Sequence, residues 1–258
     1  MLQQRFSILP SPEDFGPPKN TPPFAALGLG ALEAVWPTRC AVCDAPGALL
    51  CTTCLQELYP YDPWLACPAC GAPFSLHQCC ECNSYTQAKT PGRKQPLHVT
   101  SAFLFNRASG RMVKRFKDAD EQRLAPFMAR SMLHALSPET AKRIGAITYI
   151  PCSQKAFIRR GYDHGRLLGS SLARLLNVPL VDAFQRPHNL DQRTLSREER
   201  YANMESALNL KGSLELPPGP LLLIDDVLTT GATLNAAADI LFAAGIRNVT
   251  GLTFARVV

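Results

Sequence analysis

Residues 221–234 constrain the fold more than any other stretch of this 258-residue chain. An apolar run, 221–224, leads into two adjacent carboxylates, Asp225 and Asp226, and an apolar helical pattern begins a few residues later. This order is typical of a buried parallel strand that ends in an anion-binding loop at a helix N-terminus, where backbone N–H groups and the helix dipole favour a phosphate. The predicted loop consists of Thr229, Thr230, Gly231, Ala232 and Thr233.

The acidic pair directly precedes this loop, where a ribose could offer it hydroxyls or a Mg²⁺ ion could bridge to it. The alternative is an ordinary strand, turn and helix with a polar turn. Two adjacent carboxylates after a buried strand are costly without a role, which disfavours that alternative. The loop is not a Walker A loop, because no Gly-Lys-Ser/Thr follows, and it does not have the GxGxxG pattern either.

The chain from residue 97 onward alternates strand and helix patterns, which predicts an α/β fold with a mostly parallel sheet and helices on both faces. Strands are expected near 98–105, 145–150, 221–225 and 248–256, and helices near 109–117, 123–136, 162–176, 196–204 and 232–244. Gly245 is placed to cap the last of these helices. Ligands of such sheets bind at the carboxyl ends of the strands, so the segments 151–163 and 225–233 should face one crevice.

Nine of the ten cysteines lie between Cys40 and Cys82, and eight of them form CxxC pairs. Four such pairs predict two tetrahedral, structural Zn²⁺ sites, and disulfides are the weaker interpretation without an export signal. The pairs could group in sequence order or interleave, and Cys80 is left over beside Cys79. The expected ligands are Cys40, Cys43, Cys51, Cys54, Cys67, Cys70, Cys79 and Cys82.

The remaining segments suggest how the domains are divided. Residues 1–23 hold six prolines and are expected to be disordered, and 24–83 should contain a short apolar helix and the cysteine-rich unit. The polar composition of 84–96 predicts a linker to a domain at 97–258. The apolar run before the first cysteine is too short to cross a bilayer, so we expect a cytoplasmic protein without membrane insertion.

The net charge of +6 is unevenly spread along the chain. Residues 1–83 carry 3 Lys and Arg against 7 Asp and Glu, whereas residues 84–130 carry 10 against 3. The basic middle could contact phosphates or nucleic acid, or it could form a solvated face beside an anionic substrate site. A second basic stretch, 151–163, has residues suited to a polyanion such as diphosphate, although they could also form a solvated turn: Ser153, Lys155, Arg159 and Arg160.

The segment 221–234 resembles the ribose-phosphate fingerprint of type I phosphoribosyltransferases, a hydrophobic run and acidic pair followed by Thr/Ser-Thr/Ser-Gly-any-Thr/Ser. Two more stretches are similar to the competence protein ComF family. RGYDH at 160–164 stands where that family has Arg-Gly-aromatic-Asn-Gln, and 192–203 matches its Gln-x-x-Leu-x-x-x-Glu-Arg-x-x-Asn. With the cysteine pairs and WPTRC at 36–40, the resemblance covers about residues 24–258.

The resemblance implies a type I phosphoribosyltransferase domain behind a double zinc ribbon, which binds 5-phosphoribosyl diphosphate with Mg²⁺ and transfers the phosphoribosyl group to an unidentified acceptor. It also implies a link to competence and the use of external DNA. Asp225 and Asp226 would hold the ribose or Mg²⁺, the loop 229–233 the 5-phosphate, and the residues of 153–160 the diphosphate. No catalytic side chain is assigned, because such a transfer depends on positioning and electrostatics.

The alternative is a non-enzymatic sensor of phosphoribosyl diphosphate or a nucleotide. Its zinc ribbon would be an adaptor for single-stranded DNA or for DNA-uptake proteins. Three residues are expected to have no catalytic part: His164 and His188 as surface residues, and Cys152 as a small buried residue without a histidine partner.

Overall fold

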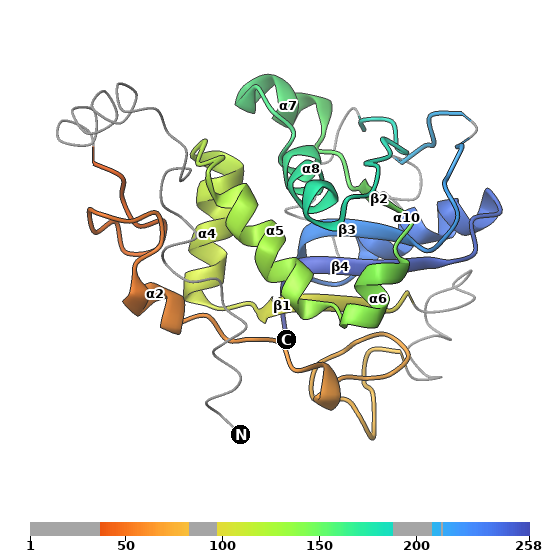
Figure 1. Cartoon of the computed structure of the whole chain (residues 1–258), viewed down its shortest axis with the longest axis horizontal. Coiled ribbons are helices and arrows are strands. Elements are labelled where there is room, and N and C mark those ends of the chain that lie inside the picture. The colour runs from red at the N-terminus through yellow and green to blue at the C-terminus, as the bar shows by residue number, and fades with distance from the viewer. Residues whose placement is uncertain (1–36, 83–96, 188–207, 213) are drawn as a thin grey trace.

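A four-stranded parallel sheet forms the centre of the computed structural model, which describes residues 37–82, 97–187, 208–212 and 214–258. The strands are β1 (Val99–Leu104), β2 (Ala146–Tyr149), β3 (Leu221–Leu228) and β4 (Val249–Arg256), in the order β1-β4-β3-β2 (Figure 1). All three strand pairs are parallel. The predicted α/β fold with a parallel sheet is therefore confirmed.

Helices cover both faces of the sheet. The helices of the larger domain are α4 (Arg107–Asp118), α5 (Leu124–Ala135), α6 (Pro138–Arg143), α7 (Gln154–Arg160), α8 (His164–Leu176) and α10 (Ala232–Ala243). One core joins α4, α5 and α8 to one face of the sheet, and a second core joins α10 to the other. The first four residues of β3 are buried, as expected for a strand covered on both sides.

The strand β3 continues three residues beyond its predicted end. The predicted strand ends at Asp225, whereas Asp225 and Asp226 both lie within β3. The extension is stabilised by pairing with β4, where Val227 is opposite Ala255 and Leu228 opposite Arg256. The carboxylates therefore stand on a rigid element, not on a mobile turn.

The expected loop at 151–163 contains the seven-residue helix α7. The Ser153 hydroxyl accepts a hydrogen bond from the Ala156 N–H at its start, and Gly161 ends it with a φ of +77°. The helices α2 (Thr52–Gln56) and α6 were also not predicted, and the expected helix at 196–204 lies outside the described residues. Gly245 has a φ of +88° directly after α10, in agreement with the predicted cap.

The two cysteine-rich units contact different parts of the sheet domain (Figure 1). The first, residues 37–56, lies against α4, where Arg111 donates to the Val42 carbonyl at 2.7 Å and Arg115 pairs with Asp44 at 2.7 Å. The second, residues 60–82, lies against β1. The backbone of residues 59–61, where the two units join, pairs with the end of that strand. Much of the basic charge of α4 thus serves to hold the first unit in place.

The helices of the described part of the chain are too short or too polar to span a lipid bilayer. None of those in residues 37–82, 97–187 and 208–258, leaving out residue 213, has both the length and the apolar character to cross a membrane.

Candidate functional site

The carboxyl end of β3 brings together two carboxylates, an ammonium and an imidazole. Lys117, near the end of α4, places its Nζ 2.6 Å from Oδ2 of Asp226. His164, the first residue of α8, places Nε2 3.9 Å from the same oxygen. One ligand atom each of His164, Asp225 and Asp226 lies within 4.8 Å of the others. The site is thus assembled from three elements that are distant in the sequence.

Asp226 is buried, with 1% of its side chain exposed. Lys117 approaches Oδ2 in a direction that is not that of a well-formed hydrogen bond, and Oδ1 has no hydrogen-bond partner among the described residues. A buried carboxylate oxygen without a partner is costly unless a ligand completes it. The donor set, two carboxylates at one strand end, suits a hard cation such as Mg²⁺.

The two adjacent carboxyls have opposite pKa shifts. Burial opposes ionisation of Asp226, yet Lys117 and His164 hold its pKa at about 2. Burial and then the negative charge of Asp226 raise the pKa of Asp225 to about 8. Burial alone would lower the pKa of Lys117, but the carboxylates of Asp226 and Asp225 raise it. The ion pair is therefore charged at neutral pH, whereas Asp225 retains a proton in the absence of a cation.

His164 is buried, so the expectation of a surface residue is wrong for this histidine. The start of α8 packs beneath α7, and burial lowers the pKa of His164 to about 4 despite the nearby Asp226 carboxylate. Its Nδ1 lies 3.3 Å from Arg160 NH1. The neutral ring therefore connects the basic segment to the acidic pair. His188, the other histidine, lies outside the described residues.

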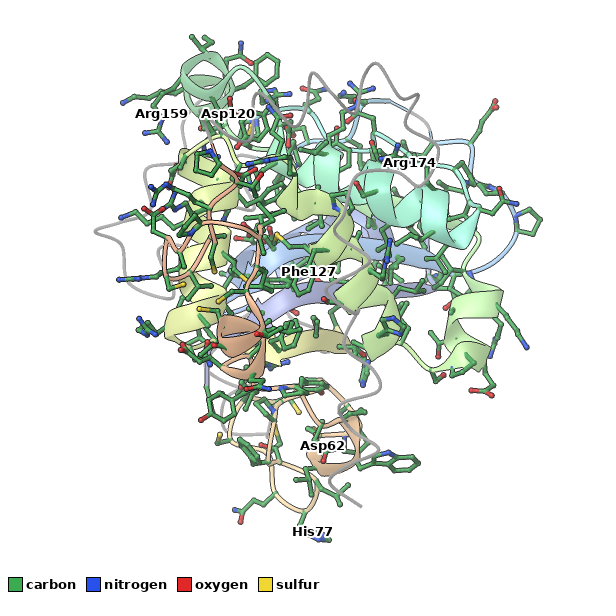
Figure 2. All side chains as sticks on the ribbon, turned by 60° about the vertical axis from the view of Figure 1, so that its left-hand side comes forward. Asp62, His77, Asp120, Phe127, Arg159 and Arg174 are labelled. Atoms are coloured by element: carbon green, nitrogen blue, oxygen red, sulfur yellow. The ribbon has the colours of Figure 1, made fainter. Side chains whose placement is uncertain are left out.

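The predicted diphosphate residues differ in how near they come to the acidic pair. Arg160, with 13% of its side chain exposed, contacts His164 and pairs with Asp118 Oδ1 at 2.9 Å. Arg159 pairs with the same oxygen at 3.3 Å but is 61% exposed, and Figure 2 shows it at one extremity of the molecule. Lys155 is exposed on α7, and Ser153 caps that helix. Within the described residues, Arg160 alone among these side chains is linked to the acidic pair, through its contact with His164.

The loop 229–233 leads from β3 into the N-terminus of α10. Gly231 has a φ of +74°, and no side chain of the described residues caps the helix. The Ala232 N–H approaches the Thr230 hydroxyl at 3.4 Å, and Asn235 Nδ2 donates to the Gly231 carbonyl at 2.6 Å. Asn235 thus holds the loop at the Gly231 carbonyl, and apart from the Ala232 N–H, which contacts Thr230, the N–H groups of the first helical turn can meet an anion.

Cys152 is buried, as the sequence suggested, but a histidine lies close to it. Its sulfur shares a cluster with Asp163 and His164 and accepts a hydrogen bond from Arg186 at 3.0 Å. Burial raises the pKa of Cys152 to about 11, so the group is a thiol at neutral pH. Asp163 caps α8 and accepts from the Cys152 N–H, which is a structural role.

Two groups of four cysteines stand in sequence order, and we call them the first and second cysteine groups: Cys40, Cys43, Cys51 and Cys54, and then Cys67, Cys70, Cys79 and Cys82. The sulfur–sulfur distances are 3.7 Å for one pair of the first group, and 3.6 Å for two pairs of the second. Four sulfurs around a tetrahedral zinc ion lie about 3.8 Å apart, because each Zn–S bond is about 2.3 Å. A disulfide would require a distance of about 2 Å. Both groups could therefore bind zinc, the interleaved grouping is excluded, and Cys80 is exposed outside the second group.

The chain has relatives among characterised proteins, although no family model matches it. It is 30% identical to Competence protein F of Haemophilus influenzae over 145 residues, 54% of this chain and 63% of that protein, which is less than two thirds of the relative. It is 25% identical to Competence protein ComFC of Bacillus subtilis over 78% of this chain and 80% of the relative. It is 27% identical to the DNA utilization protein YhgH of Escherichia coli strain K12 over 81% of this chain and 92% of the relative.

Proposed function

Because this chain belongs to the competence protein ComF family, we propose that it binds 5-phosphoribosyl diphosphate with Mg²⁺ and transfers the phosphoribosyl group to an acceptor. The names of its relatives, which refer to competence and to DNA utilization, support a role of this reaction in the uptake or use of external DNA. The observation that carries the proposal is the acidic pair at the end of β3, which is completed by Lys117 and His164 and followed by an uncapped helix.

The acidic pair would hold the ribose. Asp226, and Asp225 once a bound cation has displaced its proton, would accept hydrogen bonds from ribose hydroxyls, and their negative charge would stabilise positive charge that develops at C1 as the diphosphate departs. A bound Mg²⁺ ion, held by these carboxylates and the substrate, would offset the charge of the diphosphate. Lys117 keeps Asp226 ionised before the substrate arrives. The C1–O bond to diphosphate breaks, a bond from C1 to the acceptor forms, and the acceptor's proton leaves to solvent.

The 5-phosphate would lie at the start of α10, where Thr229, Thr230 and Thr233 offer hydroxyls and the first-turn N–H groups point along the helix dipole. The diphosphate would lie toward α7. Arg160 is the side chain best placed to meet it, with Lys155, Arg159 and the Ser153 hydroxyl as the further predicted donors. Binding the two ends of the substrate separately would orient C1 between them.

The two cysteine groups would each hold one structural zinc ion, because all four donors of each group are thiolates and leave no open ligand position. Zinc would supply rigidity to units with few large apolar residues.

Release of diphosphate tests the proposed reaction. The purified chain is incubated with Mg²⁺ and 5-phosphoribosyl diphosphate across a panel of purines, pyrimidines and amines. We expect release that depends on one acceptor class and is lost in the Asp225→Ala/Asp226→Ala variant. Glu139→Ala, which removes an exposed carboxylate on α6, is the matched control and should retain activity. Acceptor-independent release, or release that survives loss of the acidic pair, would contradict the proposal.

Binding without turnover in the same assay would favour the sensor, in which the ribbon is an adaptor for DNA or DNA-uptake proteins. The second cysteine-rich unit, 60–82, contains no Lys or Arg, which disfavours a direct role of that unit with single-stranded DNA. Salt-dependent DNA binding that survives loss of the acidic pair but not of Cys67 and Cys70 would support the adaptor. Absence of binding at low salt would exclude it.

A further inference from the structure

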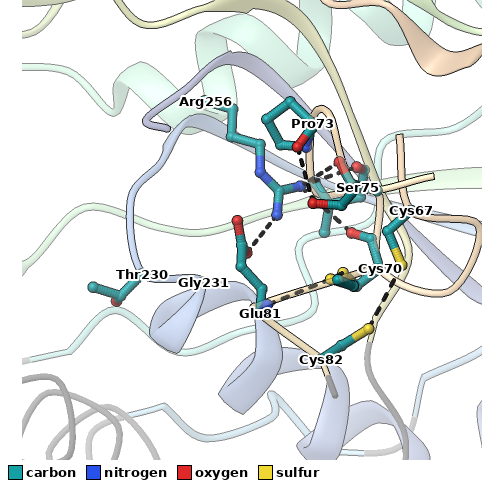
Figure 3. Close-up of polar contacts among 12 residues, drawn as sticks. Cys67, Cys70, Pro73, Ser75, Glu81, Cys82, Thr230, Gly231 and Arg256 are labelled. Atoms are coloured by element: carbon teal, nitrogen blue, oxygen red, sulfur yellow. Dashed lines mark hydrogen bonds and ion pairs between the residues drawn. The ribbon is translucent and has the colours of Figure 1, made fainter. Parts of the chain in front are cut away.

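A single buried guanidinium joins the second cysteine group to the sheet beside the loop 229–233. Arg256, the last residue of β4, has 3% of its side chain exposed and pairs with Glu81 at 2.7 Å. Its NH1 donates to the Gly71 carbonyl at 2.9 Å and lies 3.4 Å from that of Cys70 (Figure 3). One side chain thus contacts both CxxC turns of the group, since Glu81 lies between Cys79 and Cys82.

The backbone of Arg256 reaches the loop. In the parallel register it is opposite Leu228, the residue directly before Thr229. Arg256, Glu81 and Cys82 line the same small cavity as Thr230 and Gly231. The second cysteine group therefore lies beside the proposed 5-phosphate loop.

A second connection runs through Asn235 on α10. The Val99 N–H donates to the Cys70 carbonyl at 3.3 Å, which ties the start of β1 to the second group. Two residues earlier, the Leu97 N–H approaches Asn235 Oδ1 at 3.5 Å, and the amide of Asn235 donates to the Gly231 carbonyl at 2.6 Å. The loop and the second cysteine group are thus joined by hydrogen bonds on two sides.

The second cysteine group also packs tightly against β1. A Cβ on Gly71 would lie 2.0 Å from the Val99 carbonyl oxygen, so the CxxC turn is in close contact with β1. A buried guanidinium is stable only while its partners remain in place, because an unpaired buried charge is costly. If the second group rearranges, Arg256 loses acceptors at the point where β4 borders the loop.

We propose that Arg256 is a positioning residue that fixes the loop 229–233 against the second cysteine group, so that its contacts with that group set the affinity of the loop for a sugar phosphate. The predicted effect on sugar phosphate affinity rests on the proposed function, in which the loop 229–233 binds the 5-phosphate. The first cysteine group has no such connection among the described residues, since it contacts α4.

Amide hydrogen exchange and binding of ribose 5-phosphate test this inference on the full zinc-loaded chain. Arg256→Met should raise exchange at the amides of 229–233 and weaken binding of ribose 5-phosphate by about tenfold, a typical size for coupling between two sites. Glu81→Gln removes only the ion pair and should show a smaller change in the same direction. Arg256→Lys retains the charge without the fork and should be intermediate.

Arg111→Met is the matched control, because Arg111 donates to the Val42 carbonyl of the first unit as Arg256 does to Gly71 of the second. It should leave exchange in the loop and sugar phosphate affinity unchanged. Unchanged exchange in 229–233 for both Arg256→Met and Glu81→Gln would overturn the inference. If the wild-type chain does not bind ribose 5-phosphate but Arg256→Met still raises exchange, the proposed function fails while the connection stands. If Arg256→Met does not fold, Glu81→Gln and Arg256→Lys decide the outcome.

Discussion

The ammonium of Lys117 lies 2.6 Å from a carboxylate oxygen of Asp226, although 109 positions separate the two residues in the sequence. Lys117 is at the end of α4 and Asp226 near the end of β3, so the contact fixes that helix over the carboxyl edge of the sheet. The site is therefore arranged before any substrate binds.

Removing this ammonium should destabilise the chain. Lys117→Met leaves the buried carboxylate of Asp226 without its cation, and we expect a loss of about 2 kcal/mol in the free energy of unfolding. Lys114→Met removes an exposed ammonium from the same helix and should have little effect. Urea unfolding of both variants measures the difference, and equal stabilities would show that the pair contributes nothing.

The acidic pair predicts a pH dependence of stability. The ordinary carboxyl pKa of 3.8 applies to Asp225 in the unfolded chain, whereas in the folded chain it is about 8, so the folded chain binds more protons between these values. Stability from this group is present at low pH and is lost as the pH rises through about 8. The folded pKa of His164, about 4, matters only below its unfolded value near pH 6.5.

We therefore expect the free energy of unfolding, measured without Mg²⁺ between about pH 6.5 and 9, to fall more steeply for the wild type than for Asp225→Asn. Subtracting one curve from the other cancels the contribution of the cysteines. Parallel curves would mean that Asp225 is ionised throughout this range.

Zinc content should follow the two cysteine groups separately. The wild type is expected to bind two zinc ions per chain, and replacing Cys40 and Cys43, or Cys67 and Cys70, by serine should remove one ion each. Cys80→Ser should retain both ions, because the Cys80 side chain lies outside the second group. Elemental analysis of the purified variants measures the zinc content. A loss of zinc in Cys80→Ser would show that Cys80 is a ligand and that the second group is assigned wrongly.

Two glycines with the same backbone conformation should respond differently to alanine. Gly71 has a φ of +73° and its Cβ would meet a backbone oxygen at 2.0 Å, whereas Gly161 has a φ of +77° and open space. Gly161→Ala should cost about 1 kcal/mol from the φ alone. Gly71→Ala should cost about 3 kcal/mol or more, because the backbone must also move. Chemical denaturation tests this, and similar costs would mean that the second unit does not pack on β1 as described.

The sequence predicted the sheet well because its strands are apolar runs with clear ends. Strands β1, β2 and β4 begin and end within a residue or so of their expected limits. The pairing of the cysteines and the neighbours of Asp226 depend on how distant segments meet, so local patterns could not supply them. The helix α7 is hard to predict from its ends, because serine and glycine, here Ser153 and Gly161, favour turns as well as helix ends.

The burial of His164 had no local signal. The residue begins a helix after Asp163, a position that is commonly exposed, and it is covered only because α4 and α7 pack over it. Lys117 belongs to a basic run in which Arg111 and Arg115 contact the first cysteine-rich unit. Lys117 instead pairs with Asp226, because it lies near the end of α4, beside the carboxyl end of β3.

Calorimetric titration with 5-phosphoribosyl diphosphate in the presence of Mg²⁺ tests the central claim most directly. We expect one ligand per chain for the wild type and for Glu139→Ala, with binding that weakens when Mg²⁺ is removed and is lost in Asp225→Asn/Asp226→Asn. An absence of binding by the wild type, or equal affinity in the acidic-pair variant, would contradict a phosphoribosyl diphosphate site at the end of β3.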